Sequence, residues 1–178
     1  MIGIEYDDKQ VTEAMQRLMH VSSRLRPAFQ SIGEYLVLST KKRFQTSTAP
    51  DGTAWAANSE ATMVAMLHKR GGLSKKTGKI TKRGQGLATS KKPLIGESQQ
   101  LSTKIHYVAD DQSVQVGSAL KYAAVQQFGA ERGEFGSSKR GSPIPWGDIP
   151  ARPFLGVSAE DKLAILDILK EHLTAALR

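Results

Sequence analysis

The sequence predicts an α+β fold, in which a small antiparallel sheet is packed by two N-terminal helices and a long C-terminal helix. Two adjoining amphipathic helices follow an edge-like strand at the N-terminus, which favours this class. Alternating apolar residues between 103 and 116 indicate a β-hairpin. An apolar stripe between 158 and 177 indicates the last helix. The length of 178 residues suits a single domain, residues 1–178, with a large insert.

The N-terminal elements are a strand and two helices. The strand is indicated by alternation at Ile2, Ile4 and Tyr6. Asp7 or Asp8 provides the cap of the first helix. The apolar face of that helix consists of Val11, Ala14, Met15, Leu18 and Met19. The second helix begins near Pro27, which fits a first turn, and its apolar face consists of Phe29, Ile32, Leu36 and Phe44.

A turn and a short helix follow. Residues 48–52 carry Pro and Gly in an order typical of a turn. We expect Trp55, just after this turn, to cover the core. Asn58 or Ser59 caps a short helix that carries Met63, Met66 and Leu67.

The positive charge is concentrated in one insert, residues 69–92. The formal net charge is +8, yet residues 61–96 hold nine Lys or Arg and no Asp or Glu, so the rest of the chain is almost neutral. The insert is rich in glycine and poor in apolar residues, which predicts a mobile segment, with regular structure resuming at Leu94. If the chain binds DNA, the candidate contacts are Lys69, Arg70, Lys75, Lys76, Lys79, Lys82, Arg83, Lys91 and Lys92.

The second half of the chain contains the predicted hairpin and a short helix. Strands at 103–109 and 114–116 are joined at Asp110–Gln112. A helix over 119–128 ends at Gly129, and we expect it to turn Tyr122, Val125 and Phe128 inward. A polar loop, residues 130–148, follows.

Residues 149–178 combine a stiff strap with the last helix. Pro150 and Pro153 restrict the strap, residues 149–156, to extended geometry. Ser158 and Asp161 form a capping box at the start of the helix. The apolar stripe of this helix is wider than one sheet requires, so the strap and helix either seat on their own domain or form a subunit interface. The candidate interface residues are Trp146, Pro150, Arg152, Pro153, Phe154 and Leu155.

No chemical motif in the sequence points to an enzyme. The chain has no cysteine, and its four histidines lack the spacing of metal ligands. The adjacent carboxylates Asp110 and Asp111 fall in a predicted turn, where Asp is common for backbone reasons. We therefore expect no catalytic residue, no metal and no cofactor. No apolar run reaches the length of a membrane span and the N-terminus lacks the pattern of a signal peptide, so we expect an intracellular protein, or one released by lysis.

Four blocks of the sequence together resemble one family. The first block consists of Phe44, Pro50, Asp51, Gly52, Trp55, Thr62 and Lys69. The second consists of Leu94, Ile95, Leu101, Ile105 and Tyr107, and the third of residues 116–118, 122–123 and 127–129. The fourth is the strap followed by Ser158 and Asp161. In this order they resemble the virion morphogenesis, or tail-completion, proteins of Mu-like and related contractile-tailed phages and prophages.

The resemblance implies a structural role in finishing the tail or the head–tail neck. Related neck and tail-end proteins form rings, commonly hexamers, so the implied partners are other copies of the chain and other phage neck or tail proteins. The implied location is the virion, reached by assembly in the host cytoplasm. Ser98 stands where the family usually has glycine, and the basic insert and the loop at 131–142 are longer than usual. The role of the insert is therefore not implied by the family.

Two other hypotheses remain open. The chain could be a nucleic-acid-binding module, whose basic insert contacts phosphates, for example of DNA in a channel, without reading their sequence. It could also be an enzyme, such as a wall hydrolase carried on a tail, although the sequence offers no poised carboxylate or metal site for that role.

Overall fold

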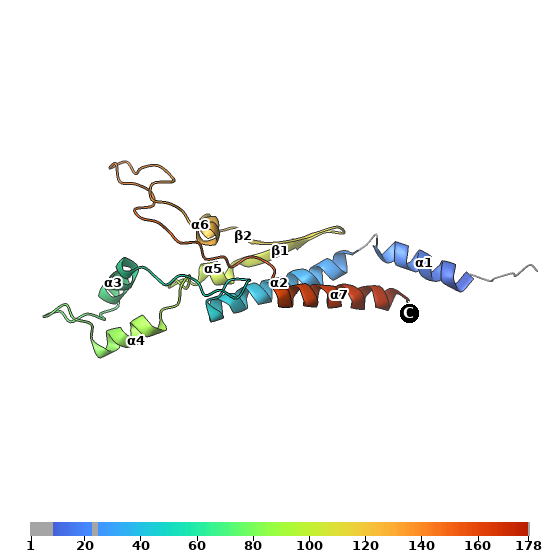
Figure 1. Cartoon of the computed structure of the whole chain (residues 1–178), viewed down its shortest axis with the longest axis horizontal. Helices are drawn as coiled ribbons and strands as arrows, with labels where there is room; N and C mark the ends of the chain where they lie inside the picture. Colours follow the sequence, from blue (N-terminus) through green and yellow to red (C-terminus); the bar gives the residue numbers. More distant parts are fainter. Residues whose placement is uncertain (1–8, 23–24, 178) are drawn as a thin grey trace, which may run out of the picture. The chain divides into compact units, whose positions relative to one another are not determined.

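The computed structural model, which describes residues 9–22 and 25–177, has the predicted α+β fold (Figure 1). Its elements in chain order are α1 Lys9–Ser22, α2 Arg26–Thr46, α3 Glu60–Lys69, α4 Lys82–Ser90, α5 Gln100–Thr103, β1 Ile105–Ala109, β2 Val114–Ser118, α6 Ala123–Phe128 and α7 Ala159–Leu177. The strand predicted at residues 2–6 and the cap at Asp7 or Asp8 lie outside the described residues.

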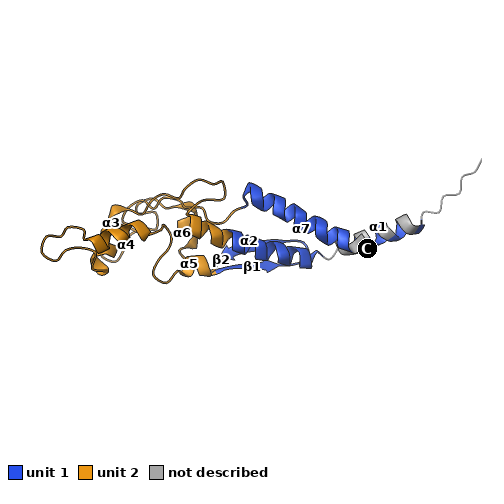
Figure 2. Cartoon of the chain, turned by 90° about the horizontal axis from the view of Figure 1, so that it is seen from below, with its two compact units in different colours: residues 1–39, 105–117, 157–178 blue, residues 40–104, 118–156 orange. Residues whose placement is uncertain are grey.

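The chain divides into two compact units. The first comprises residues 1–39, 105–117 and 157–178, and the second comprises residues 40–104 and 118–156 (Figure 2). The strap ends where the second unit ends, and α7 belongs to the first. That the whole chain is one folding domain stays a prediction.

The first unit contains α1, most of α2, the hairpin and α7. The strands β1 and β2 form the predicted antiparallel pair. Gly33 of α2 faces the ring of Tyr107 on β1, and a Cβ at Gly33 would lie 2.4 Å from that ring. Glycine is therefore what allows α2 to approach the hairpin so closely. Helix α7 packs against α1.

The predicted capping box of α7 is confirmed. The Ser158 N–H donates to the Asp161 carboxylate at 2.8 Å, and the Asp161 N–H donates to Ser158 Oγ at 3.1 Å. Asp161 is buried, and its other oxygen accepts a bond of 2.7 Å from Ser39 Oγ on α2. The cap thus also joins α7 to α2 within the first unit.

The second unit contains the last turns of α2, helices α3 to α6 and the strap. The turn at 48–52 and the cap of α3 by Ser59 are as predicted. Trp55 is buried in the core, also as predicted.

Two expectations about this unit are wrong. The insert is not without regular structure, because Thr81 caps α4 and an isolated bridge joins Leu73 to Ile80. Helix α6 buries Ala123, whereas Tyr122 is 43% and Phe128 79% exposed. The helix begins at Ala123 rather than at residue 119, so Tyr122 precedes it, and Phe128 is exposed at the C-terminal end that was predicted. Among the described helices, none combines the length and hydropathy that a membrane span requires.

Candidate functional site

The strap pairs with backbone at Ile149, which bridges Ala130, and at the Arg152 N–H, which donates to the Gln126 carbonyl. Beyond these points, side chains bind its backbone. Gln127 Oε1 accepts bonds of 3.0 Å from the N–H groups of Phe154 and Leu155, and Gln127 Nε2 donates to the Leu155 carbonyl at 3.0 Å. Trp55 Nε1 donates to the Pro153 carbonyl at 2.8 Å. One nitrogen of Arg43 donates to the carbonyls of Phe154 and Gly156. These bonds take the place of a sheet ladder over residues 153–156 of the strap.

Phe154 of the strap packs into a cluster of three aromatic rings. Phe154 is 0% exposed, and its ring centroid lies 5.4 Å from that of Phe44. Phe44 in turn meets Trp55 edge to face at 5.3 Å. Such pairs add to the free energy gained by burying the rings themselves. The cluster is the core of the second unit.

The strap turns away from this core at Gly156. Its φ is +148°, and a Cβ there would lie 2.7 Å from the Pro50 ring. Both facts require glycine at this position.

The structure separates the six candidate interface residues into buried, half-buried and exposed pairs. Arg152 is only 7% exposed, and it donates from Nε to the Ala56 carbonyl and from a terminal nitrogen to the Ala57 carbonyl, each at 2.8 Å. Burial lowers the pKa of its guanidinium, which nevertheless stays charged. Arg152 and Phe154 therefore act inside the unit. Pro153 and Leu155 are half-buried, whereas Pro150 and Trp146 are exposed.

Residues 130–148, expected to form a polar loop, make a backbone-paired arm (Figure 1). Its base is closed by two reciprocal bonds of 2.9 and 2.8 Å between Ala130 and Ile149. Further along, the Phe135 N–H donates to the Ile144 carbonyl, and the Ile144 N–H donates to the Gly136 carbonyl, each at 2.8 Å. The pairing was not predicted from the sequence, because the glycine-rich composition of residues 130–148 is typical of a loop.

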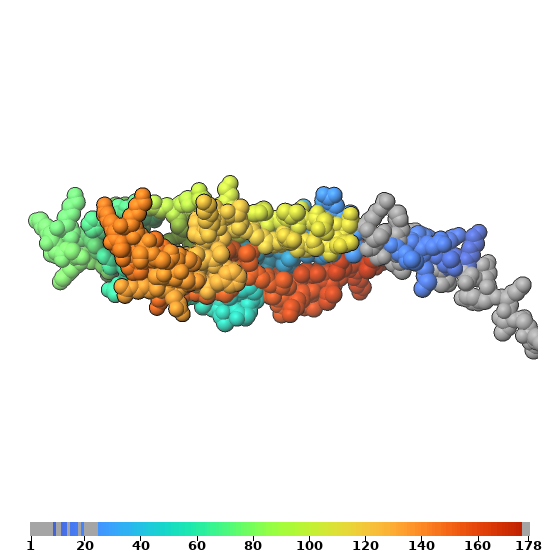
Figure 3. Space-filling view, turned by 90° about the horizontal axis from the view of Figure 1, so that it is seen from above, coloured from blue at the N-terminus to red at the C-terminus, as the bar shows by residue number. Residues whose placement is uncertain are grey.

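The arm carries large apolar side chains that face solvent. Trp146 is 82% exposed, Phe135 53% and Ile144 40%. Figure 3 shows residues 130–148, in orange, standing at the surface of the second unit. Clustered exposed aromatic residues on a small element are typical of a protein–protein contact.

A cleft of about 670 Å³ lies beside the strap in the second unit. Its walls include Asn58 and Ser59 before α3, Leu94 and Ile95 after α4, and Pro150 of the strap. Lys91 also lines it and donates to the Ile95 carbonyl. Burial, aided by the charge of Arg70, lowers the pKa of Lys91, although Glu97 opposes this. Because the walls come from separate stretches of sequence, no local pattern could have revealed the cleft.

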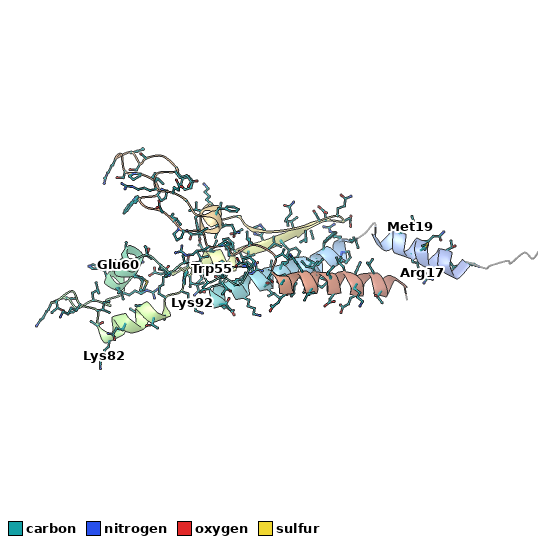
Figure 4. The ribbon with its side chains drawn as sticks, in the orientation of Figure 1. Arg17, Met19, Trp55, Glu60, Lys82 and Lys92 are labelled. Carbon is teal, nitrogen blue, oxygen red and sulfur yellow. The ribbon has the colours of Figure 1, made fainter. Side chains whose placement is uncertain are left out.

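The nine candidate DNA-contacting cations fall into two groups. Lys69 and Arg70 pair with Glu97, at 2.7 and 3.6 Å. Lys91 binds the Ile95 carbonyl, and Lys92 Nζ donates to the Gln45 carbonyl at 2.6 Å. The second group is Lys75, Lys76, Lys79, Lys82 and Arg83. These side chains are exposed, and no carboxylate or carbonyl of the described residues pairs with them. Figure 4 contrasts Lys82, which projects from the start of α4, with Lys92, which lies beside the end of α2.

Part of the last helix also faces solvent. Leu163 is 65% and Leu166 62% exposed, whereas Ile165 and Leu169 are half-buried. Both exposed residues belong to the apolar stripe that the sequence showed to be unusually wide. Within the part of the chain that the structure describes, no three His, Asp or Glu side chains gather as metal ligands would.

Comparison with known proteins gives consistent matches over most of the sequence. Residues 6–174 match the phage virion morphogenesis family. The chain is 26% identical over 173 residues to Mu-like prophage FluMu G protein 2 of Haemophilus influenzae, covering 97% of this chain and 96% of that protein. It is 30% identical over 136 residues to tail completion protein S of Escherichia phage P2, covering 76% of this chain and 75% of that protein. No solved structure matches the chain.

The family match spans all four blocks from which the resemblance was drawn, including the strap and the capping box of α7. The chain therefore belongs to the phage virion morphogenesis family.

Proposed function

We propose that the protein is a structural subunit that completes the phage tail or joins it to the head, and that it acts as a ring of identical copies. Family membership supports a structural role in the phage tail, and the name of the P2 relative supports tail completion in particular. The ring and the neck position go beyond these findings. The ring is supported by the apolar surfaces that the subunit leaves exposed, and the neck position by the family resemblance.

The observation that carries the proposal is the exposed apolar surface of the arm. An indole that is 82% exposed contributes little to the stability of a lone subunit, because its apolar area stays in water. Buried in a contact, the same side chain is among those that contribute most to binding. Trp146 and Phe135 of the arm are therefore the proposed centre of a subunit contact.

A ring needs two different surfaces on each subunit. A head-to-tail interface joins one patch to another patch on the next copy, and it closes into a ring when the rotation allows. The arm provides one patch in the second unit, and the outward face of α7 provides a separate apolar patch in the first. The proposal also includes contacts with other tail proteins. The ring would be part of the virion, after assembly in the host cytoplasm.

The experiment replaces the arm aromatics and measures both folding and assembly. In Trp146→Ser with Phe135→Ser, we expect the unfolding midpoint to stay close to that of the parent chain, because both side chains are exposed. We expect light scattering to show smaller particles, and phage complementation to fail. Arg140→Ser, another exposed arm residue, is the matched control and should assemble normally.

The proposal fails if the parent chain stays a monomer at high concentration, with and without tail partners. It also fails in its choice of surface if the double variant assembles and complements as the parent does.

A further inference from the structure

The five unpaired cations of the insert lie on one short element, which we call the tip, residues 72–84. They are Lys75, Lys76, Lys79, Lys82 and Arg83. Four other cations of the insert bind Glu97 or backbone carbonyls. Glu97 offsets only one of these four charges, but among the described residues the cations of the insert without a protein partner lie at the tip. Figure 3 shows it as the light-green atoms at an edge of the second unit.

Backbone bonds hold the tip in a defined shape. The Ser74 N–H donates to the Lys79 carbonyl at 2.9 Å, and the Thr81 N–H donates to the Gly72 carbonyl at 3.0 Å. Gly84 packs so closely on Gly72 that a Cβ at Gly84 would lie 2.1 Å from the Gly72 oxygen. Between Gly72 and Gly84 the chain turns at Gly78, whose φ is +66°. The cations are therefore presented together, at a small loss of entropy on binding.

The placement of these charges does not stabilise the subunit. Lys82 and Arg83 occupy the first turn of α4, where the helix dipole favours negative groups and disfavours cations. The insert has no carboxylate between residues 61 and 96 to offset them. Repulsion among five neighbouring cations costs further free energy, which an anionic partner would recover.

We propose that the tip binds the phosphate backbone of double-stranded nucleic acid, without reading its sequence. Lysine and arginine neutralise phosphates and release counterions, which supplies the affinity of non-specific binding. Residues 61–96 contain no Phe, Tyr or Trp, so the large aromatic rings on which single-stranded bases stack are missing. An acidic protein fits less well, because protein interfaces are depleted in lysine and centred on aromatic anchors.

The test measures how binding of a labelled DNA duplex of mixed sequence depends on salt. For five neutralised phosphates, the slope of log K against log salt should be about −4.5. A variant with all five tip cations changed to Gln should lose most of this slope and should bind at least about 100-fold more weakly at low salt. Thermal unfolding should occur at the same or a slightly higher temperature, because the replaced side chains are exposed and unpaired and their repulsion is removed.

The matched control removes the same charge elsewhere. It changes five other exposed lysines to Gln: Lys42, Lys104, Lys121, Lys162 and Lys170. Both variants lower the formal net charge of +8 by five units. The proposal requires that the control keep the parent's slope.

Two results would overturn the proposal. Equal losses of DNA affinity and salt slope in both variants would mean that binding depends on the net charge of the chain and not on the tip. Unchanged DNA binding by the tip variant, together with loss of assembly, would assign the tip to a protein partner instead. Unchanged DNA binding by the tip variant overturns this proposal whether or not the chain forms a ring, so this proposal and the proposed function can fail separately.

Discussion

At the scale of single residues, side chains of the second unit form hydrogen bonds with the strap backbone that a neighbouring strand would otherwise form. The strap contains two prolines, which cannot donate to a ladder, and the backbone groups around them still need partners once buried. Gln127 satisfies three such groups, and Arg43 and Trp55 satisfy three more. Long side chains with several donors or acceptors suit this task, because one residue can reach two carbonyls.

Arg152 provides a test at this scale. Arg152→Ala removes both bonds to the Ala56 and Ala57 carbonyls, so we expect the free energy of unfolding to fall by about 1–3 kcal/mol. Arg152→Lys should recover only part of the loss, because lysine cannot reproduce the two-nitrogen geometry. Denaturant unfolding measures both changes, with Trp146→Ala as the control that should move by less than about 0.5 kcal/mol. An Arg152→Ala chain as stable as its parent would return Arg152 to the candidate interface.

At the scale of elements, the N-terminal cap of helix α7 has two structural roles. The spacing of Ser158 and Asp161 predicted the reciprocal bonds that begin the helix. It could not predict the bond from Ser39, which stands 122 positions away in sequence. A residue expected to cap one helix therefore also joins two helices of the first unit.

This double role predicts an unequal effect of two cap substitutions. Ser158→Ala removes one capping acceptor and should cost about 1 kcal/mol. Asp161→Ala removes the acceptor of both Ser158 and Ser39 in a buried place, and should cost on the order of 2–4 kcal/mol. Denaturant unfolding of the two variants and of Ser39→Ala gives the comparison. Equal costs for Ser158→Ala and Asp161→Ala would show that the bond to Ser39 contributes nothing.

The β-hairpin should respond to acid through Asp110. The backbone N–H of Gln112, and then the backbone N–H and hydroxyl of Ser113, hold the pKa of its carboxyl below the ordinary value. The stabilisation is therefore present above the unfolded pKa and is lost as the pH falls through the folded one. NMR titration should show the amide shifts of Gln112 and Ser113 changing together at a pH below the ordinary range of Asp. Asp110→Asn should abolish that step, and a midpoint at or above the ordinary value would contradict the assignment.

At the scale of the whole molecule, the sequence revealed local features and missed those made by distant segments. The helices α1, α2, α3 and α7, the hairpin, the caps of α3 and α7 and the burial of Trp55 are local signals, and each was predicted correctly. The cleft and the internal role of Arg152 depend on residues from separate stretches, whereas the pairing of the arm is local but lies in a glycine-rich sequence typical of a loop. The separation of the basic insert into paired and unpaired cations likewise depends on Glu97 and Gln45, which lie outside the insert.

Both units expose apolar area that a lone subunit does not use. The second unit has the arm and Phe128, and the first has the outward leucines of α7 together with Met15 and Met19 of α1. Single exposed apolar residues are normal on protein surfaces, but groups of them on one element mark contacts. A subunit built for a larger assembly would show this distribution.

The outward face of α7 gives the last prediction. Leu163→Gln with Leu166→Gln should change the stability of the subunit little, because both leucines are mostly exposed and glutamine is a good helix former. If the face is buried between copies, burial of each leucine contributes about 1.5–3 kcal/mol, so the pair should weaken association by at least about 100-fold. Sedimentation at several concentrations measures the shift. Lys162→Gln with Glu171→Gln, on the same helix, is the control, and equal association of all three chains would confine the contact to the arm. Weaker association in the leucine variant alone would instead establish that the width of the stripe reflects a second surface.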